Sequence, residues 1–155
     1  MGRVWELSGV VSSGLGEGAQ FTALPWAQRE FETSLGFQPV PGTFNLSMTG
    51  SAWQACRERL RSAPGVAIEP PQGYCRAKCF AVLLCNRVTG ALVRPEVPGY
   101  PEDKFEVLCP IAVRETLGLS DGERISVKLW FDWVQAQNDY RVIAAGSGRL
   151  TEVAP

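Results

Sequence analysis

The stretch "PVPGTFNL", residues 39–46, places two prolines and a glycine directly before a short strand-like segment. Proline presets its φ angle and glycine permits positive φ angles, so these residues predict a turn. In the strand that follows, residues two apart point to the same face. Thr43 and Asn45 should therefore project together while Phe44 points to the other side.

This Thr-Asn pair has two interpretations. Both side chains offer hard oxygen donors of the kind that Mg²⁺ accepts, yet both are neutral. Mg²⁺ held there would keep several waters and would take its negative ligands from the phosphates of a nucleotide. The plainer interpretation is a threonine and an asparagine that hydrogen-bond locally beside a turn, and the motif taken alone favours it.

Composition limits the function classes. The chain has 155 residues, 45% of them apolar, which is enough for one domain with a buried core. A net charge of -1 gives no electrostatic footprint for nucleic acid or for an anionic membrane. The sequence lacks both a long apolar run and the apolar core of a signal peptide, so we expect a cytoplasmic protein. We also expect a monomer.

Histidine is absent from the chain, which excludes Ser-His, Cys-His and His-metal mechanisms. Acid or base work must come from carboxylates, lysine, tyrosine or a bound metal. The cysteines lie mostly in strand-like apolar runs without the paired CxxC spacing of zinc sites, so they are interpreted as buried reduced thiols. The five are Cys56, Cys75, Cys79, Cys85 and Cys109.

The order of elements predicts the fold class. Helices are expected over residues 24–37, 51–65 and 110–119, and a last strand with a frayed tail over 139–150. Another strand is expected over 124–134. Strands outnumber helices without alternating regularly with them, which argues against a doubly wound parallel sheet. We predict one α+β domain over residues 1–155, a small, mostly antiparallel β-barrel with two or three packed helices.

The glycine-rich stretch "SGLGEG", residues 13–18, could cradle an anion, because glycines permit the backbone angles of an N–H nest. It lacks the Gly-Lys-Ser/Thr of a Walker A loop. It also opens no obvious helix within a βαβ unit, as a dinucleotide fingerprint would. Taken alone, it favours a simple turn.

Three segments in succession change that interpretation. They are "SGLGEGAQF", "LGFQPVPGTFNL" and "VRPEVPGYPEDKFEVLCPIAVRETLGLSDGE". Their order and spacing over residues 7–128 resemble the archaeal-type CTP-dependent riboflavin kinases, which are small cradle-loop barrels. Residues 132–155 are interpreted as a C-terminal extension of the same domain.

The resemblance implies roles for individual residues. Thr43 and Asn45 would ligate Mg²⁺. Glu106 would contact the flavin and could orient or deprotonate the ribityl 5′-hydroxyl, although such a residue can also be an ordinary solvent-facing carboxylate. The partners would be CTP or CDP and riboflavin or FMN. The nucleotide-binding residues would be Leu15, Gly16, Glu17, Gly18, Ala19, Gln20, Ile111, Ala112, Val113 and Arg114.

One position departs from the family pattern. Pro98 stands where the family usually has a threonine that helps to hold the flavin, and proline offers neither a hydroxyl nor an N–H. Tyr100 and Phe105 could border the flavin ring. Two alternatives stay open, namely a kinase of another small alcohol and a non-catalytic barrel, which would bind a nucleotide or flavin or regulate transcription.

Overall fold

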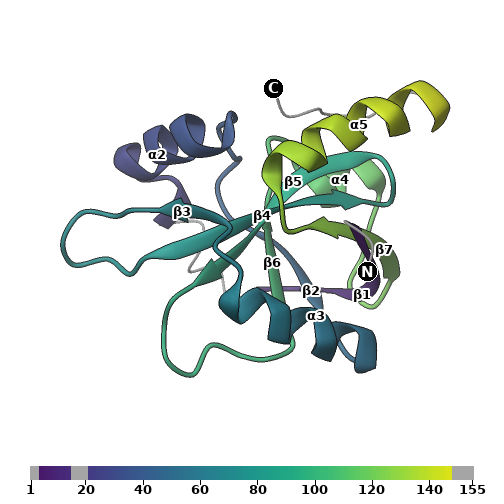
Figure 1. The fold of residues 1–155 in the computed structure, drawn as a ribbon, viewed down its shortest axis with the longest axis horizontal. Helices are drawn as coiled ribbons and strands as arrows, with labels where there is room; N and C mark the ends of the chain where they lie inside the picture. The colour runs from purple at the N-terminus through teal and green to yellow at the C-terminus, as the bar shows by residue number, and fades with distance from the viewer. Residues whose placement is uncertain (1–3, 15–20, 148–155) are drawn as a thin grey trace.

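The computed structural model describes residues 4–14 and 21–147. These residues form seven strands and four helices (Figure 1). The strands are β1 (Val4–Ser12), β2 (Phe44–Ser47), β3 (Val66–Ile68), β4 (Ala77–Leu84), β5 (Val88–Pro95), β6 (Lys104–Leu108) and β7 (Arg124–Trp130). The helices are α2 (Pro25–Leu35), α3 (Ser51–Ser62), α4 (Val113–Leu117) and α5 (Trp133–Ser147).

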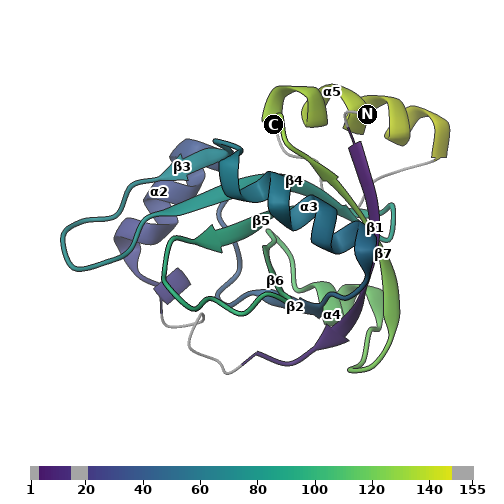
Figure 2. The same cartoon turned by 60° about the horizontal axis from the view of Figure 1, so that its bottom comes forward.

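The sheet closes on itself. Its strand order is β3-β4-β5-β6-β2-β1-β7, and β4 also pairs with β7. Six strands therefore complete a ring, while β3 extends the sheet from β4. Every pairing is antiparallel. Figure 2 shows helices on different sides of this barrel. The predicted α+β class and the mostly antiparallel barrel are confirmed.

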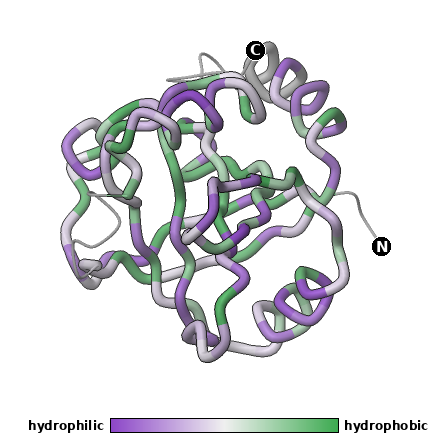
Figure 3. Tube along the Cα trace, turned by 90° about the vertical axis from the view of Figure 1, so that its left-hand side faces the viewer, coloured by the Kyte–Doolittle hydropathy of each residue, from purple (hydrophilic) through white to green (hydrophobic). Residues whose placement is uncertain are grey.

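Strand β4 shows why the barrel carries helices. Val82 and Leu84 point into the core inside the ring. Ala81 and Leu83 alternate with them and join an outer cluster with α5. A strand buried on both faces needs a nearly continuous apolar sequence, as "CFAVLL" provides. Figure 3 shows the corresponding concentration of hydrophobic residues in the central strands.

The predicted last strand is wrong, because helix α5 covers Trp133–Ser147. Strand β7 ends at Trp130, and the Asp132 carboxylate then accepts the N–H of Gln135 at 3.0 Å, which caps the first turn of α5. Ala136 and Tyr140 are one helical turn apart and both are buried against β4. The described residues thus contain one helix more than the sequence predicts.

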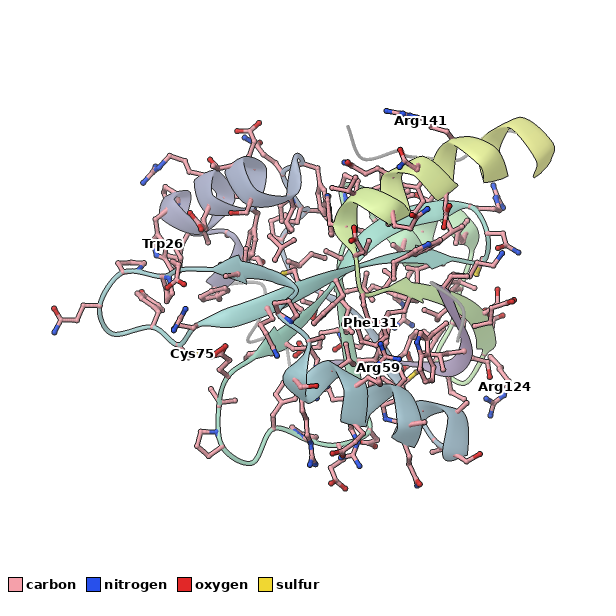
Figure 4. All side chains as sticks on the ribbon, in the orientation of Figure 1. Trp26, Arg59, Cys75, Arg124, Phe131 and Arg141 are labelled. Atoms are coloured by element: carbon pink, nitrogen blue, oxygen red, sulfur yellow. The ribbon has the colours of Figure 1, made fainter. Side chains whose placement is uncertain are left out.

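Helix α3 closes another side of the barrel and is held at its C-terminal end. The Lys78 ammonium donates to the carbonyl oxygens of Leu60, Arg61 and Ala63 at 2.7 to 3.1 Å. A cation at this end complements the partial negative charge of the terminal carbonyls. On the same helix the Arg59 guanidinium lies 4.9 Å from the ring centre of Phe131, a pair labelled in Figure 4.

Within residues 4–14 and 21–147, the helices are all too short or too polar to cross a bilayer.

Candidate active site

The predicted Thr-Asn pair lies at the start of strand β2, with Thr43 directly before the strand and Asn45 within it. Asn45 lies opposite Ser12 of β1 and opposite Glu106 of β6. Its amide nitrogen donates to the backbone oxygen of Thr43 at 2.9 Å and to the Thr43 hydroxyl at 3.3 Å. The prediction that Thr43 and Asn45 project together is confirmed.

Glu106 completes this group from the neighbouring strand. Its Oε1 accepts a hydrogen bond from the Thr43 hydroxyl at 3.1 Å, and its Oε2 accepts one from the hydroxyl of Tyr100. The Lys104 ammonium lies 3.6 Å from Oε2. The Glu106 side chain is 14% exposed, so it is not the solvent-facing carboxylate of the plainer interpretation. Thr43, Asn45 and Glu106 form the central cluster of the site.

The turn before β2 is tied to the start of α2. The N–H of Gly42 donates to the Thr22 hydroxyl at 2.6 Å. The Gln28 side chain donates to the carbonyl oxygens of Thr22 at 2.6 Å and Pro39 at 3.0 Å. Gly42 has a φ of 96°, which glycine adopts without strain. Sequence reasoning missed Thr22 and Gln28, because their contacts join segments separated by the α2 helix.

A first cleft opens on one side of the cluster. Its volume is about 220 Å³ and it is lined by residues 40–44 and 111–115, together with Val107 and Cys109. The Pro-Gly-Thr turn therefore lines the same cleft as the predicted nucleotide-binding residues Ile111, Ala112, Val113 and Arg114. These segments are far apart in the sequence, and the structure brings them together as the resemblance implies.

Arg114 is oriented by a contact that the sequence does not reveal. Its guanidinium lies 2.7 Å from the Asp121 carboxylate, which also accepts a hydrogen bond from the Ser13 hydroxyl at 2.7 Å. The Ser13 hydrogen bond and then Arg114 hold the pKa of Asp121 below its ordinary value. Asp121 thus links the first cleft to the segment that leads into the glycine loop.

The glycine loop itself, residues 15–20, lies outside the described residues. The predictions for Leu15, Gly16, Glu17, Gly18, Ala19 and Gln20 stay predictions. Their neighbour Gly14 is described, and it lies directly against Asn45: a Cβ on Gly14 would be 2.8 Å from the Asn45 amide nitrogen. The chain thus leaves β1 in contact with the central cluster.

A second cleft is linked to Glu106 through Tyr100, which lines it. Its volume is about 580 Å³ and it is lined by residues 94–100 with Arg57, Arg61 and Glu102. Pro98 is an exposed part of this lining. Tyr100 belongs to the same wall and reaches Glu106 through its hydroxyl. The cluster of Thr43, Asn45 and Glu106 therefore borders the first cleft through Thr43 and reaches the second through the hydroxyl of Tyr100.

Residues 11–129 match the family model CTP-dep_RFKase, whose description reads "Domain of unknown function DUF120". The chain belongs to the CTP-dependent riboflavin kinase family. A Methanosarcina barkeri protein named Riboflavin kinase is 35% identical over 130 residues, which cover 81% of this chain and 57% of that protein. One of the same name from Pyrobaculum islandicum is 38% identical over 130 residues, covering 81% and 61%. The chain spans about three fifths of the length of these relatives.

The donor atoms of the central cluster fit the Mg²⁺ site that the sequence resemblance predicts. The hydrogen bonds of Asn45 described above use its amide nitrogen, which leaves its carbonyl oxygen to act as a ligand beside the Thr43 hydroxyl. Both are hard donors, and the Glu106 carboxylate lies next to them. Within residues 4–14 and 21–147, no three Cys, Asp or Glu side chains gather as an alternative metal site.

Two further predictions are corrected by burial. Phe105 is completely buried against Trp53, because it alternates with Glu106 along β6 and points into the core. It cannot border a bound flavin.

Among the cysteines, Cys56, Cys79 and Cys109 are buried thiols, and burial raises the pKa of each to about 12. The other two differ from the prediction, since Cys75 is exposed and Cys85 is half-buried.

Proposed function

We propose that this chain is a CTP-dependent riboflavin kinase, which transfers the γ-phosphoryl group of CTP to the 5′-hydroxyl of riboflavin and yields FMN and CDP. One observation carries the proposal. The central cluster borders the first cleft, which Thr43 lines, and is hydrogen-bonded to Tyr100 in the wall of the second cleft. Family membership and the names of the relatives supply the nucleotide and the acceptor.

The two clefts divide the substrates between them. The nucleotide would occupy the first cleft, where the Arg114 guanidinium offsets the negative charge of the phosphates. Riboflavin would occupy the second cleft with its ribityl chain directed toward Glu106. Phosphoryl transfer depends mainly on such positioning and on charge neutralisation, and it needs little covalent chemistry from the protein.

Glu106 is the residue that orients and deprotonates the acceptor hydroxyl. Thr43 and Asn45 would hold Mg²⁺, which when bound supplies charge neutralisation for the phosphates. The carboxylate orients the 5′-hydroxyl and takes its proton as the new O–P bond forms and the bond to the CDP oxygen breaks. The proton then passes to solvent. This role is supported by the position of the carboxylate, which lies beside the hydroxyl of Thr43.

A kinase of another small alcohol is the second candidate, and Pro98 favours it. This residue is exposed in the second cleft, where it offers no hydrogen-bond donor to a flavin. The remaining lining is rich in arginine, so a different polar acceptor would also be accommodated.

A substrate screen separates these candidates. The protein is incubated with Mg²⁺, riboflavin and each of the four ribonucleoside triphosphates, and the products are read by mass. We expect FMN and CDP with CTP, and much less FMN with the other nucleotides. Bound CTP without FMN would refute riboflavin as the acceptor and support the second candidate.

Glu106→Gln tests the mechanism within the same assay. The amide keeps the size of the side chain but cannot accept the hydroxyl proton, so kcat should fall far more than the riboflavin KM rises. A rise in KM alone would mean that Glu106 only anchors the ribityl chain. The monomeric state and the cytoplasmic location stay predictions, and size-exclusion chromatography with light scattering tests the first of them.

A further inference from the structure

The two oxygens of the Glu106 carboxylate face different parts of the site. Oε1 accepts the Thr43 hydroxyl at 3.1 Å on the side of the first cleft. Oε2 accepts the hydroxyl of Tyr100 on the side of the second cleft. Since a carboxylate held at both oxygens has little rotational freedom, these donors together set the direction in which Glu106 points.

Tyr100 is itself held in place by cations. The Arg94 guanidinium lies 5.2 Å from the centre of the Tyr100 ring and 5.9 Å from that of Trp53. The Lys104 ammonium lies 5.5 Å from the Tyr100 ring. Cations over aromatic faces attract them, and more strongly where water is excluded. The half-buried loop residue Tyr100 is therefore anchored to β5 and, through Arg94, to helix α3.

Within the described part of the chain, the Arg94 guanidinium is engaged by aromatic rings and not by a carboxylate. Over residues 4–14 and 21–147, Arg94 forms no ion pair; it lies over the two rings and donates a 3.5 Å hydrogen bond to the Lys104 carbonyl oxygen. Burial lowers the pKa of Arg94, and burial followed by the Glu106 hydrogen bond raises that of Tyr100. The phenol thus stays a proton donor at neutral pH, as a partner of a carboxylate must.

We infer that Tyr100 is a positioning residue for the reaction: its hydroxyl aims the Glu106 carboxylate at the acceptor hydroxyl, and Arg94 holds the Tyr100 ring for this task. The inference rests on the proposed kinase activity. Without the phenol hydroxyl, Oε2 would lose its donor from the second cleft, and the carboxylate could swing toward the Lys104 ammonium 3.6 Å away. The reacting geometry would then be lost while the pocket walls remain.

Tyr100→Phe tests this, because it removes the hydroxyl and keeps the ring over Arg94. We expect kcat for FMN formation to fall about tenfold or more, as the loss of a hydrogen bond to a charged group would produce. Riboflavin affinity, measured by flavin fluorescence, and CDP affinity in the presence of Mg²⁺ should change less than about twofold, since neither cleft loses a wall. This split distinguishes positioning from a structural defect.

Tyr140→Phe is the matched control. It makes the same chemical change in helix α5, where the Tyr140 hydroxyl donates to the Val82 carbonyl oxygen at 3.1 Å. This variant should lose thermal stability but keep kcat. If Tyr100→Phe fails to fold, Arg94→Lys replaces it: the charge stays but the planar group over Tyr100 is lost, so kcat should again fall with riboflavin affinity preserved.

The outcomes are distinct. An active wild-type protein with unchanged kcat in Tyr100→Phe would overturn this inference alone. A fall in kcat matched by an equal loss of riboflavin affinity would also overturn it, because Tyr100 would then be a substrate contact. No FMN from the wild-type protein would overturn the proposed function itself.

Discussion

Gly14→Ala should weaken metal-dependent nucleotide binding by acting on Asn45. A Cβ at this position would lie 2.8 Å from the Asn45 amide nitrogen and 3.2 Å from its side-chain carbon. The shorter distance is about 0.6 Å below ordinary van der Waals contact at 3.4 Å. Asn45 is only 8% exposed and lies between β1 and β6, so it has little room to yield without leaving Thr43.

The expected loss of nucleotide affinity follows from the hydrogen bond that Asn45 would lose. If Asn45 moves away, its 2.9 Å hydrogen bond to the Thr43 carbonyl oxygen is lost. A lost neutral hydrogen bond costs about 0.5–1.5 kcal/mol, and this corresponds to a factor of about 2 to 12 in affinity. Calorimetric titration of CDP into the protein in buffer with excess Mg²⁺ should show a loss in this range.

A double-mutant cycle provides the decisive result. With Asn45→Ala already present, the clash has no partner, so adding Gly14→Ala should cost almost nothing. Equal losses in both backgrounds would refute the reasoning, as would unchanged affinity in the single variant. Gly73→Ala is the control for affinity, since Gly73, unlike Gly14, has open space for a Cβ and does not line either cleft. Its φ of 98° means that this substitution should lower stability but leave nucleotide affinity unchanged.

Four further predictions concern the metal, the acceptor and the thiols. Because the ligands are neutral, Mg²⁺ should bind tightly only when CDP is present, and Thr43→Val should weaken this uptake in calorimetry; tight binding without nucleotide would contradict it. Pro98→Thr should lower the riboflavin KM by a factor of a few, up to about ten, through one added hydrogen bond, and an unchanged KM would argue against that contact. At pH 8 iodoacetamide should modify the exposed Cys75 but spare Cys79, because burial raises the pKa of Cys79 to about 12. Intact mass and peptide mapping measure this, and a modified Cys79 would contradict the prediction. For the same reason the free energy of unfolding should fall as the pH rises above 9, since folded Cys79 keeps a proton that the unfolded chain releases.

Helix α2 illustrates what local sequence predicts well. Pro25 lies in its first turn, and Gly36 ends it with a φ of 85° while its N–H donates to the Glu32 carbonyl oxygen. Both effects depend on the backbone preferences of single residues, so they can be predicted without knowing the rest of the fold.

Helix α5 is the contrary case. The adjacent β-branched residues Val142 and Ile143 favour a strand locally, as the sequence predicts. Burial of Ala136 and Tyr140 against β4 instead favours a helix.

The sequence by itself determined the turn before β2, the shared face of Thr43 and Asn45, and the order of motifs that marks the family, because these depend on neighbouring residues or on the period of a strand. Only the tertiary structure decided which other groups meet that pair. Glu106 joins Thr43 because β6 pairs with β2 in a particular register, and Tyr100 joins Glu106 because the loop after β5 folds back over Arg94. Such contacts depend on strand register and loop path, which side-chain alternation alone does not specify.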